Sequence, residues 1–274
     1  MTVWINGTLL ADSAARVSVF DHGLTVGDGV FETIRISGGV PFALTRHLAR
    51  LSASAAGLGL PAPDLDQVRA GIAALLDAAG GPAAARMRIT LTGGESPLGS
   101  ARGGGPATVI VALGEWPVIE AACDVVMVPW TRNEHGALAG LKTTSYAENV
   151  LALGYARERG GGEAIFANTA GNLCEGTGTS VFVVSGGRLL TPPLSSGCLA
   201  GVTRGLVIEW AGAIEEDLPA GALAAAPEAF LTSTTRDVQP VRAVNGRPLA
   251  AAPGPVTRRA AGIFAAMSAA QSDP

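Results

Sequence analysis

The sequence predicts an α/β (α+β) protein of two domains. Its 274 residues are enough for two medium domains, each with a buried core. Both halves contain alternating apolar segments, typical of strands, and segments in which apolar residues recur at helical spacing. A proline-containing stretch at 115–122 separates the halves. We therefore expect a small N-terminal domain over 1–114, a linker over 115–122 and a larger C-terminal domain over 123–274.

The first half opens with the pattern of a β-hairpin, because Asn6-Gly7 favours a tight turn between two apolar runs. A glycine-containing stretch at 21–35 then permits close backbone approach, which is typical of a segment that lines a cleft. The other expected elements are a strand at 16–20, a helix capped by Thr45, a helix at 64–79, a strand at 86–92, a long loop at 93–106 and a strand at 108–113.

The second half mixes short strands with three helices. Gly186-Gly187 and Asn245-Gly246 mark two further hairpin turns. The expected elements, in order, are a strand at 124–130, a helix at 149–157, strands at 163–167 and 181–184, a helix at 201–210, a strand at 229–235 and a closing helix at 255–270.

Composition excludes several classes of function. A net charge of -4 and an isoelectric point near 5.4 provide no basic field for nucleic acid. No apolar run approaches the roughly 20 residues that a membrane span needs, and the first residues lack the pattern of a secretory signal, so we expect a cytoplasmic protein. Cys123, Cys174 and Cys198 follow no ligand spacing, which favours reduced thiols and no metal site.

Lys142 is the only lysine in the chain, whereas 18 residues are arginine. This composition suggests that arginine has replaced lysine wherever a plain positive charge is enough, whereas the amine of Lys142 has been kept. An amine can lose its proton and act as a nucleophile, which a guanidinium cannot do. The alternative is that a single lysine has remained on the surface by chance. The residues near Lys142 in the sequence distinguish a reactive amine from such a surface residue.

Three features of the second half fit one cofactor. The expected helix start at 201–203 offers N–H donors and a dipole suited to phosphate, and the hydroxyl cluster at 232–235 offers donors of the same kind. Glu175 lies beside Gly176, where a flat ring can approach the backbone. Each of these features is common by itself, and four successive hydroxyl residues mark the end of a strand more often than a phosphate site. Together with Lys142 they meet the needs of pyridoxal 5'-phosphate (PLP): an amine, a phosphate cradle and an acid for the pyridine nitrogen.

The order of short motifs resembles the class IV aminotransferase family, the fold type IV PLP enzymes. That family includes branched-chain aminotransferases, D-amino acid aminotransferases and 4-amino-4-deoxychorismate lyases. The resemblance implies a D-amino acid aminotransferase-like fold with the cofactor between two domains, and a homodimer whose partner subunit completes each site. The motifs are Gly27-Asp-Gly-Val-Phe-Glu-Thr33, His47-Leu-Ala-Arg-Leu51, Gly-Leu-Lys142, Asn149-Val-Leu-Ala, Glu163-Ala, Glu175-Gly-Thr-Gly, Gly201-Val-Thr-Arg204 and Phe230-Leu-Thr-Ser-Thr.

The resemblance also implies a role for each matching residue. Lys142 would hold PLP as a Schiff base and move the proton at the substrate carbon, and Glu175 would protonate the pyridine nitrogen. Tyr146 would contact the cofactor, with packing in the following helix as the alternative. The residues that would bind the phosphate are Arg50, Val202, Thr203, Ser233 and Thr234.

On the substrate side the resemblance implicates Arg35, Arg88 and Thr235. If both arginines line the pocket, the substrate is an anionic amino compound, because buried guanidinium groups need partners. The alternative is a structural ion pair on a polar strand face.

Thr33 favours the lyase, which would release pyruvate and 4-aminobenzoate from aminodeoxychorismate. The lyases carry threonine at this position and the branched-chain enzymes glycine, so Thr33 is a second catalytic candidate after Lys142; strand packing also explains a threonine here. Thr92-Gly93-Gly94 departs from the lyase pattern, which leaves a branched-chain or D-amino acid aminotransferase as the alternative. A non-enzymatic cofactor-binding or scaffold protein is a third reading, and the intact Lys142 and Glu175 argue against it.

Overall fold

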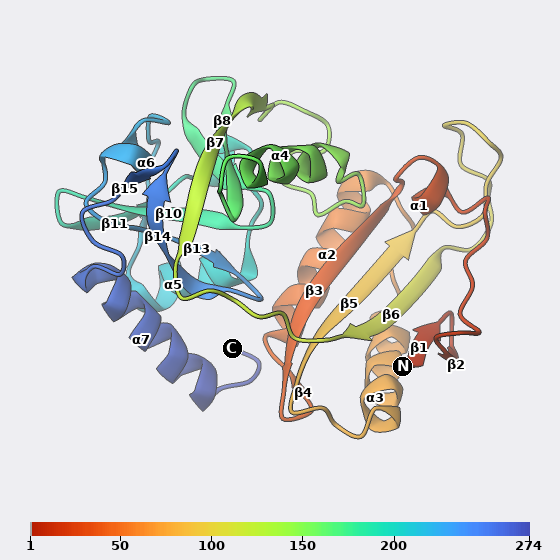
Figure 1. Cartoon of the computed structure of the whole chain (residues 1–274). Helices are drawn as coiled ribbons and strands as arrows, with labels where there is room; N and C mark the ends of the chain where they lie inside the picture. The colour runs from red at the N-terminus through yellow and green to blue at the C-terminus, as the bar shows by residue number, and fades with distance from the viewer. Residues whose placement is uncertain (1) are drawn as a thin grey trace. The chain divides into compact units, whose positions relative to one another are not determined.

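The computed structural model describes residues 2–274, which form two compact units of mixed α/β structure (Figure 1). The first unit contains the described residues up to Pro117, together with Leu141–Tyr146 and Ser272–Pro274. The second contains Val118–Gly140 and Ala147–Gln271. The sequence assigned both short segments of the first unit to the C-terminal domain, so the units are not continuous stretches of chain.

The first unit is built on a six-stranded antiparallel sheet in the order β2-β1-β6-β5-β3-β4. The predicted hairpin is confirmed, because Asn6 and Gly7 adopt positive φ angles of 44° and 91° between its strands. The strands are β1 (Thr2–Ile5), β2 (Thr8–Ala11), β3 (Gly29–Ser37), β4 (Val40–Pro41), β5 (Ala84–Thr92) and β6 (Thr108–Gly114).

Two amphipathic helices, α2 (Leu44–Leu58) and α3 (Leu65–Ala78), supply the core of this unit. The side chain of Asp64 accepts hydrogen bonds from the first turn of α3, as expected for the predicted helix at 64–79. The buried cluster joins both helices to the sheet and includes Val30, Ile34, Ile36, Leu48, Leu51, Ile72, Leu75, Met87, Ile89 and Val111.

The start of α2 lacks a cap from its own side chains. Its N-cap residue, Ala43, has a φ of 53° and offers no acceptor. The Asp273 carboxylate accepts hydrogen bonds from the Thr45 backbone N–H at 2.8 Å and from the Thr45 hydroxyl at 2.6 Å. The prediction that Thr45 caps this helix is therefore wrong. Thr45 lies in the first turn, and a residue distant in sequence supplies the cap.

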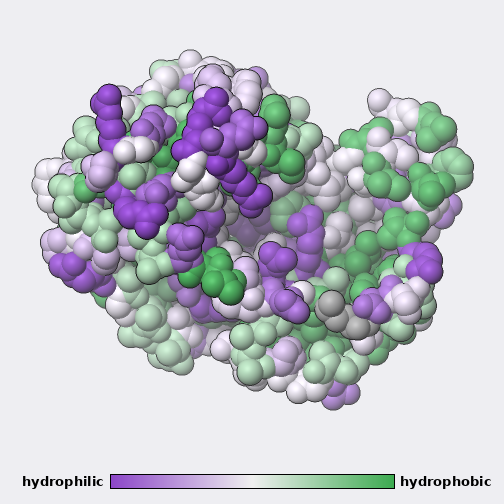
Figure 2. Space-filling model, viewed as in Figure 1, coloured by the Kyte–Doolittle hydropathy of each residue, from purple (hydrophilic) through white to green (hydrophobic). Residues whose placement is uncertain are grey.

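The prediction of a strand at 16–20 is also wrong. The carbonyl of Ser18 accepts a hydrogen bond from Asp21 N–H, which closes a turn, and no ladder pairs this segment. Alternating apolar residues form a strand only where a sheet edge pairs with them. Val19 and Phe20 remain exposed here, as do Leu24 on α1 (His22–Thr25) and Leu98. Figure 2 shows the apolar surface that this part of the first unit presents.

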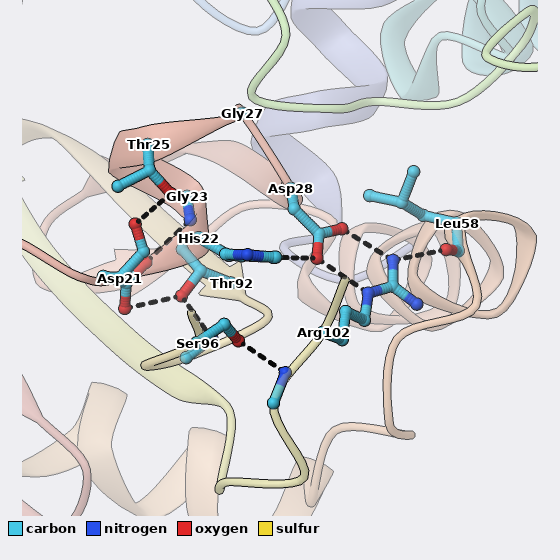
Figure 3. A network of polar contacts seen from close by, with 12 residues as sticks. Asp21, His22, Gly23, Thr25, Gly27, Asp28, Leu58, Thr92, Ser96 and Arg102 are labelled. Atoms are coloured by element: carbon cyan, nitrogen blue, oxygen red, sulfur yellow. Dashed lines mark hydrogen bonds and ion pairs between the residues drawn. The ribbon is translucent and has the colours of Figure 1, made fainter. Parts of the chain in front are cut away.

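The long loop between β5 and β6 is held by a polar network (Figure 3). Arg102 donates to both carboxylate oxygens of Asp28, at 2.7 and 2.6 Å, and to the carbonyl of Leu58 at 2.7 Å. Asp21 accepts hydrogen bonds from the hydroxyls of Thr92 and Thr108 at the two ends of the loop. The loop is therefore tied to the segment before β3 and to the end of α2.

The second unit is built on a sheet in the order β12-β11-β10-β13-β14-β7-β8-β9, with β15 paired to β14. The strands are β7 (Cys123–Arg132), β8 (Glu163–Asn168), β9 (Leu173–Gly176), β10 (Ser180–Ser185), β11 (Arg188–Thr191), β12 (Ile214–Glu215), β13 (Ala229–Ser233), β14 (Asp237–Val244) and β15 (Arg247–Pro248). The core strand β7 pairs in parallel with β8 and with β14, and the other neighbouring pairs of the sheet are antiparallel except β11 with β12.

Three helices of the second unit follow the predicted pattern, and a fourth, short helix at Ala222–Ala225 was not predicted. They are α4 (Ala147–Arg157), α5 (Val202–Ala211), α6 (Ala222–Ala225) and α7 (Pro255–Ala270). The bounds of α7 match the predicted closing helix, and α5 begins directly after Gly201. Among residues 2–274, no helix combines the length and apolar character needed to cross a membrane.

Candidate active site

The backbone around Lys142 extends the sheet of the first unit. Phe31 N–H donates to the carbonyl of Lys142 at 3.0 Å, and Thr144 N–H donates to the carbonyl of Gly29 at 2.7 Å. An antiparallel bridge pairs Val30 with Thr143, which places Lys142 opposite Phe31 on the same face of the sheet. On the other side, Lys142 N–H donates to the Ser54 hydroxyl of α2 at 3.2 Å. The segment is thereby fixed between β3 and α2.

Phe31 is the centre of the cluster that contains Lys142. The Nζ atom of Lys142 lies 4.3 Å from the centroid of the Phe31 ring, and the guanidinium carbon of Arg88 lies 3.6 Å from it. The ring of Tyr146 meets Phe31 edge to face, with centroids 5.2 Å apart. Thr33 is the direct cross-strand partner of Arg88. Four predicted site residues, Lys142, Arg88, Tyr146 and Thr33, are thus brought together.

Arg35 is two residues beyond Thr33 on β3. It lies further along β3, opposite Arg86, and its guanidinium carbon sits 4.4 Å from the ring centroid of Phe42. Arg88 lies on the exposed face of β5, and partial burial of its guanidinium beside Phe31 lowers its pKa. Arg88 is therefore better placed than Arg35 to bind an anion beside Lys142.

A buried carboxylate lies on the helix-facing side of β3. Glu32 is fully buried, at 0% exposure, among strand positions that are otherwise apolar. It accepts two hydrogen bonds from Arg50, from Nε at 2.8 Å and from Nη2 at 2.7 Å. His47 Nδ1 lies 2.6 Å from the second carboxylate oxygen. Arg50 is therefore part of a buried Glu32–His47–Arg50 cluster that the sequence analysis did not identify.

The electrostatics of this cluster keep Glu32 ionised. Burial alone raises the pKa of Glu32, but Arg50 and His47 outweigh this effect and lower the pKa from 4.5 to about 2. Burial lowers the pKa of His47, and this effect is larger than the opposing effect of Glu32, which raises it. The His47 ring is accordingly neutral near pH 7 and donates its Nδ1–H to the carboxylate.

We expect Glu32 to stabilise the fold in a pH-dependent way. Because its pKa is lower in the folded chain, the stabilisation is complete above pH 4.5 and is lost as the pH falls through 2. A shift of this size corresponds to about 3 kcal/mol. In urea titrations, the free energy of unfolding of Glu32→Gln should therefore fall less between neutral pH and about pH 3 than that of the wild type. Equal pH dependence in both proteins would contradict the assignment.

Glu175 lies on β9 in the second unit and is held by two partners. Its Oε2 accepts a hydrogen bond from Leu199 N–H at 2.8 Å, and its Oε1 lies 3.3 Å from Arg132 Nε. Arg132 also binds Glu148 and donates to Asn149 Oδ1 at 2.8 Å, and its guanidinium covers the ring of Phe166. These contacts fix the carboxylate next to the glycine-rich stretch after it.

A second carboxylate, Glu163, orders that stretch. Its Oε1 accepts hydrogen bonds from the backbone N–H and the hydroxyl of Thr177, and its Oε2 lies 3.3 Å from Arg236 Nη2. A Cβ at Gly176 would lie 2.1 Å from the Thr179 hydroxyl, so a larger residue here would displace the side chain of Thr179. The glycine at position 176 of the motif is therefore explained by close packing beside Glu175.

The residues predicted to hold the phosphate in this unit converge through the pairing of β10 with β13. Ser180 is the cross-strand partner of Thr232, and a Cβ at Gly201 would lie 2.8 Å from the Ser180 hydroxyl. Val202 and Thr203 open α5 directly after Gly201, which provides no side-chain cap. Ser233 ends β13, and Thr234 and Thr235 form the turn that follows. Arg50, the fifth predicted phosphate ligand, belongs to the first unit.

Some residues of these networks left no distinct signal in the sequence. Arg132 is one of 18 arginines and follows no motif, although it contacts Glu175 directly. Glu32 did leave a signal, because a charged residue interrupts the apolar positions of a strand while His47 and Arg50 follow one helical turn apart. Within residues 2–274, no group of three or more His, Cys, Asp or Glu is arranged to hold a metal ion.

The fold and the arrangement around Lys142 and Glu175 define a class of enzyme. The model of the family "Amino-transferase class IV" matches residues 29–244. The chain therefore belongs to the class IV aminotransferase family and is a PLP-dependent enzyme of fold type IV.

Two relatives of known name are similar to this chain over most of their length. The chain is 34% identical to a putative branched-chain-amino-acid aminotransferase of Methanocaldococcus jannaschii over 256 residues, covering 90% of this chain and 89% of that protein. It is 29% identical to a D-alanine aminotransferase of Bacillus licheniformis, covering 94% of each protein. Both relatives are named as aminotransferases, one for branched-chain amino acids and the other for D-alanine.

Solved structures match almost the whole chain. A branched-chain aminotransferase from Thermoproteus uzoniensis with norvaline superposes with a TM-score of 0.88 at 31% identity, covering 97% of this chain and 93% of that one. The PLP-bound form of a hypothetical aminotransferase from Mycobacterium tuberculosis gives a TM-score of 0.88 at 26% identity, covering 97% and 98%.

The residues of this chain fit PLP. Lys142 supplies the one side-chain amine in the sequence. At the start of α5 no side chain caps the helix, and the neighbouring Thr232 hydroxyl is buried without a hydrogen-bond partner among the described residues. An uncapped helix start beside an unsatisfied hydroxyl suits a phosphate, which accepts hydrogen bonds from both.

Proposed function

We propose that the protein is an aminotransferase whose amino donor is a branched-chain L-amino acid and whose acceptor is a 2-oxo acid. The names of the relatives support transfer over the lyase reaction that Thr33 favoured, because the relatives described above are aminotransferases. The 34% identity to the Methanocaldococcus protein supports a branched-chain amino acid as the donor. A D-amino acid remains the alternative donor, in view of the Bacillus relative.

One observation carries the proposal of an amino acid substrate: Arg88 and Lys142 share the ring of Phe31. A guanidinium at this place can bind the carboxylate of an amino acid while the adjacent amine reaches its α-carbon. The rings of Phe31 and Tyr146 offer an apolar wall, which suits an aliphatic side chain better than a second charge. The Thr33 hydroxyl, opposite Arg88, can orient the carboxylate.

Lys142, Glu175 and the phosphate-binding residues have separate tasks in the proposed reaction. When bound, PLP supplies an electron sink for the negative charge that develops at the substrate carbon. Lys142 holds the cofactor and moves the proton at that carbon. Glu175, fixed by Arg132 and Leu199 N–H, keeps the pyridine nitrogen protonated. The phosphate is assigned to Arg50, Val202, Thr203, Ser233 and Thr234.

Like these roles, three further assignments are predictions. The contact of Tyr146 with the cofactor is one, since its ring also packs on Phe31. The substrate role of Arg35 and Thr235 is another, because Arg35 stacks on Phe42 and the Thr235 hydroxyl lies 3.4 Å from that of Ser233. The homodimer is the third, and the exposed apolar side chains of Phe20, Leu24 and Leu98 are consistent with it.

The proposal predicts the products of the purified enzyme. L-Leucine, L-valine or L-isoleucine with 2-oxoglutarate should yield glutamate and the matching 2-oxo acid, with kcat/KM at least about tenfold above that of D-alanine. Aminodeoxychorismate should release no pyruvate. Preference for D-alanine would select the D-amino acid enzyme, and pyruvate release would restore the lyase reading.

A further inference from the structure

We propose that Glu32 is a positioning residue for the cofactor: it holds the Arg50 guanidinium in the orientation that binds the phosphate of PLP. The inference rests on the proposed phosphate role of Arg50. It goes beyond that role by assigning a function to a carboxylate that touches neither cofactor nor substrate.

Geometry supports a positioning role for Glu32. An arginine side chain has several rotatable bonds, so an isolated guanidinium samples many orientations at an entropic cost to binding. Here Nε and Nη2 of Arg50 bind the two oxygens of one carboxylate, at 2.8 and 2.7 Å. A bidentate pair of this kind fixes both the plane and the direction of the guanidinium.

Glu32 is itself rigidly held. It is fully buried on β3, and His47 Nδ1 contacts its Oε2 at 2.6 Å. His47 and Arg50 lie three residues apart on α2, so they reach the same carboxylate from neighbouring positions of one helix face. The cluster therefore connects strand β3 of the first unit to the helix that carries Arg50.

The same helix contacts the backbone of Lys142 through the hydroxyl of Ser54. Ser54 lies four residues after Arg50, on the same face of α2. A shift of α2 would disturb both positions, whereas loss of the Glu32 anchor alone would free the guanidinium and leave the Lys142 segment in place. This difference separates a positioning role from a general structural one.

The test compares two ligands of the apo-protein, PLP and pyridoxal, which differ by the phosphate alone. Dissociation constants come from absorbance titrations at neutral pH. In Glu32→Gln the affinity for PLP should fall about tenfold or more, because a charge-assisted bidentate pair is lost, while the affinity for pyridoxal should stay within about twofold of the wild type. An equal loss for both ligands, or no loss for PLP, would overturn the proposal.

Two controls sharpen the result. Asp28→Asn removes a different carboxylate that binds an arginine in the same unit, that of Arg102, and should leave the ratio of the two affinities unchanged. In an Arg50→Ala background, Glu32→Gln should change that ratio no further, since Glu32 acts through Arg50. An additional loss in the double variant would show that Glu32 acts by another route.

If Glu32→Gln does not fold, Glu32→Asp replaces it. The shorter carboxylate keeps the charge but cannot reach both nitrogens at the same positions, so the selective loss of PLP affinity should appear in weaker form. These titrations contain no amino donor. A wrong assignment of the donor therefore leaves their outcome unchanged, and a failed titration leaves the proposed transfer reaction untouched.

Discussion

Replacing Lys142 with alanine is expected to reduce turnover by about 10³-fold or more, because the variant loses both the amine that holds the cofactor and the base that moves the substrate proton. No other lysine can take over, since the chain has only one. Borohydride treatment of the wild type with PLP should fix the mass of the cofactor on the peptide that contains Lys142. Steady-state kinetics and mass spectrometry measure the two effects.

Lys142→Arg is the matched control for charge. It keeps a cation near the ring of Phe31 but has no nucleophilic amine, so its turnover should be as low as that of the alanine variant. Substantial turnover in Lys142→Arg, or cofactor mass on a different peptide of the wild type, would show that the amine of Lys142 is not the reactive group.

Replacing Glu175 with glutamine is expected to keep the cofactor bound and to lower kcat by about 10²-fold or more. Glutamine can still accept the hydrogen bond from Leu199 N–H, so the local backbone should hold. It carries no negative charge, however, and cannot keep the pyridine nitrogen protonated. The absorbance of bound cofactor and the kcat for the best amino donor are the two measurements.

Glu148→Gln serves as the control for this variant. Glu148 pairs with the same arginine as Glu175, namely Arg132, but it is about half exposed. Its loss removes an ion pair from Arg132 while the carboxylate of Glu175 remains. We expect kcat of Glu148→Gln to stay within about threefold of the wild type, as is usual for exposed ion pairs. A comparable loss in both variants would assign the effect to Arg132.

Local patterns explain why much of the fold is predictable from the sequence. The Asn6-Gly7 turn, the amphipathic α3 with its Asp64 cap and the closing helix α7 each depend on residues close together in the chain. The alternation of β5 likewise assigns Arg88 to the exposed face of the strand and Met87 to the core. Such features need no knowledge of distant contacts.

The features that sequence analysis missed depend on distant residues. The cap of α2 comes from Asp273, and Arg132 reaches Glu175 from another strand. The expected strand at 16–20 has suitable residues but no partner strand. At the candidate site, the family resemblance pointed to Lys142 and Arg88 separately, but only the fold shows that both contact Phe31.

The discontinuous first unit has a consequence for synthesis on the ribosome. The chain passes between the units four times, at 117/118, 140/141, 146/147 and 271/272. Leu141–Tyr146 emerges after most of the first unit, and Ser272–Pro274 emerges only after the second unit. Before Leu141–Tyr146 emerges, β3 lacks the segment that pairs with part of its edge. Before Asp273 emerges, α2 lacks its cap. The first unit therefore begins to emerge before the second unit but is completed only after it.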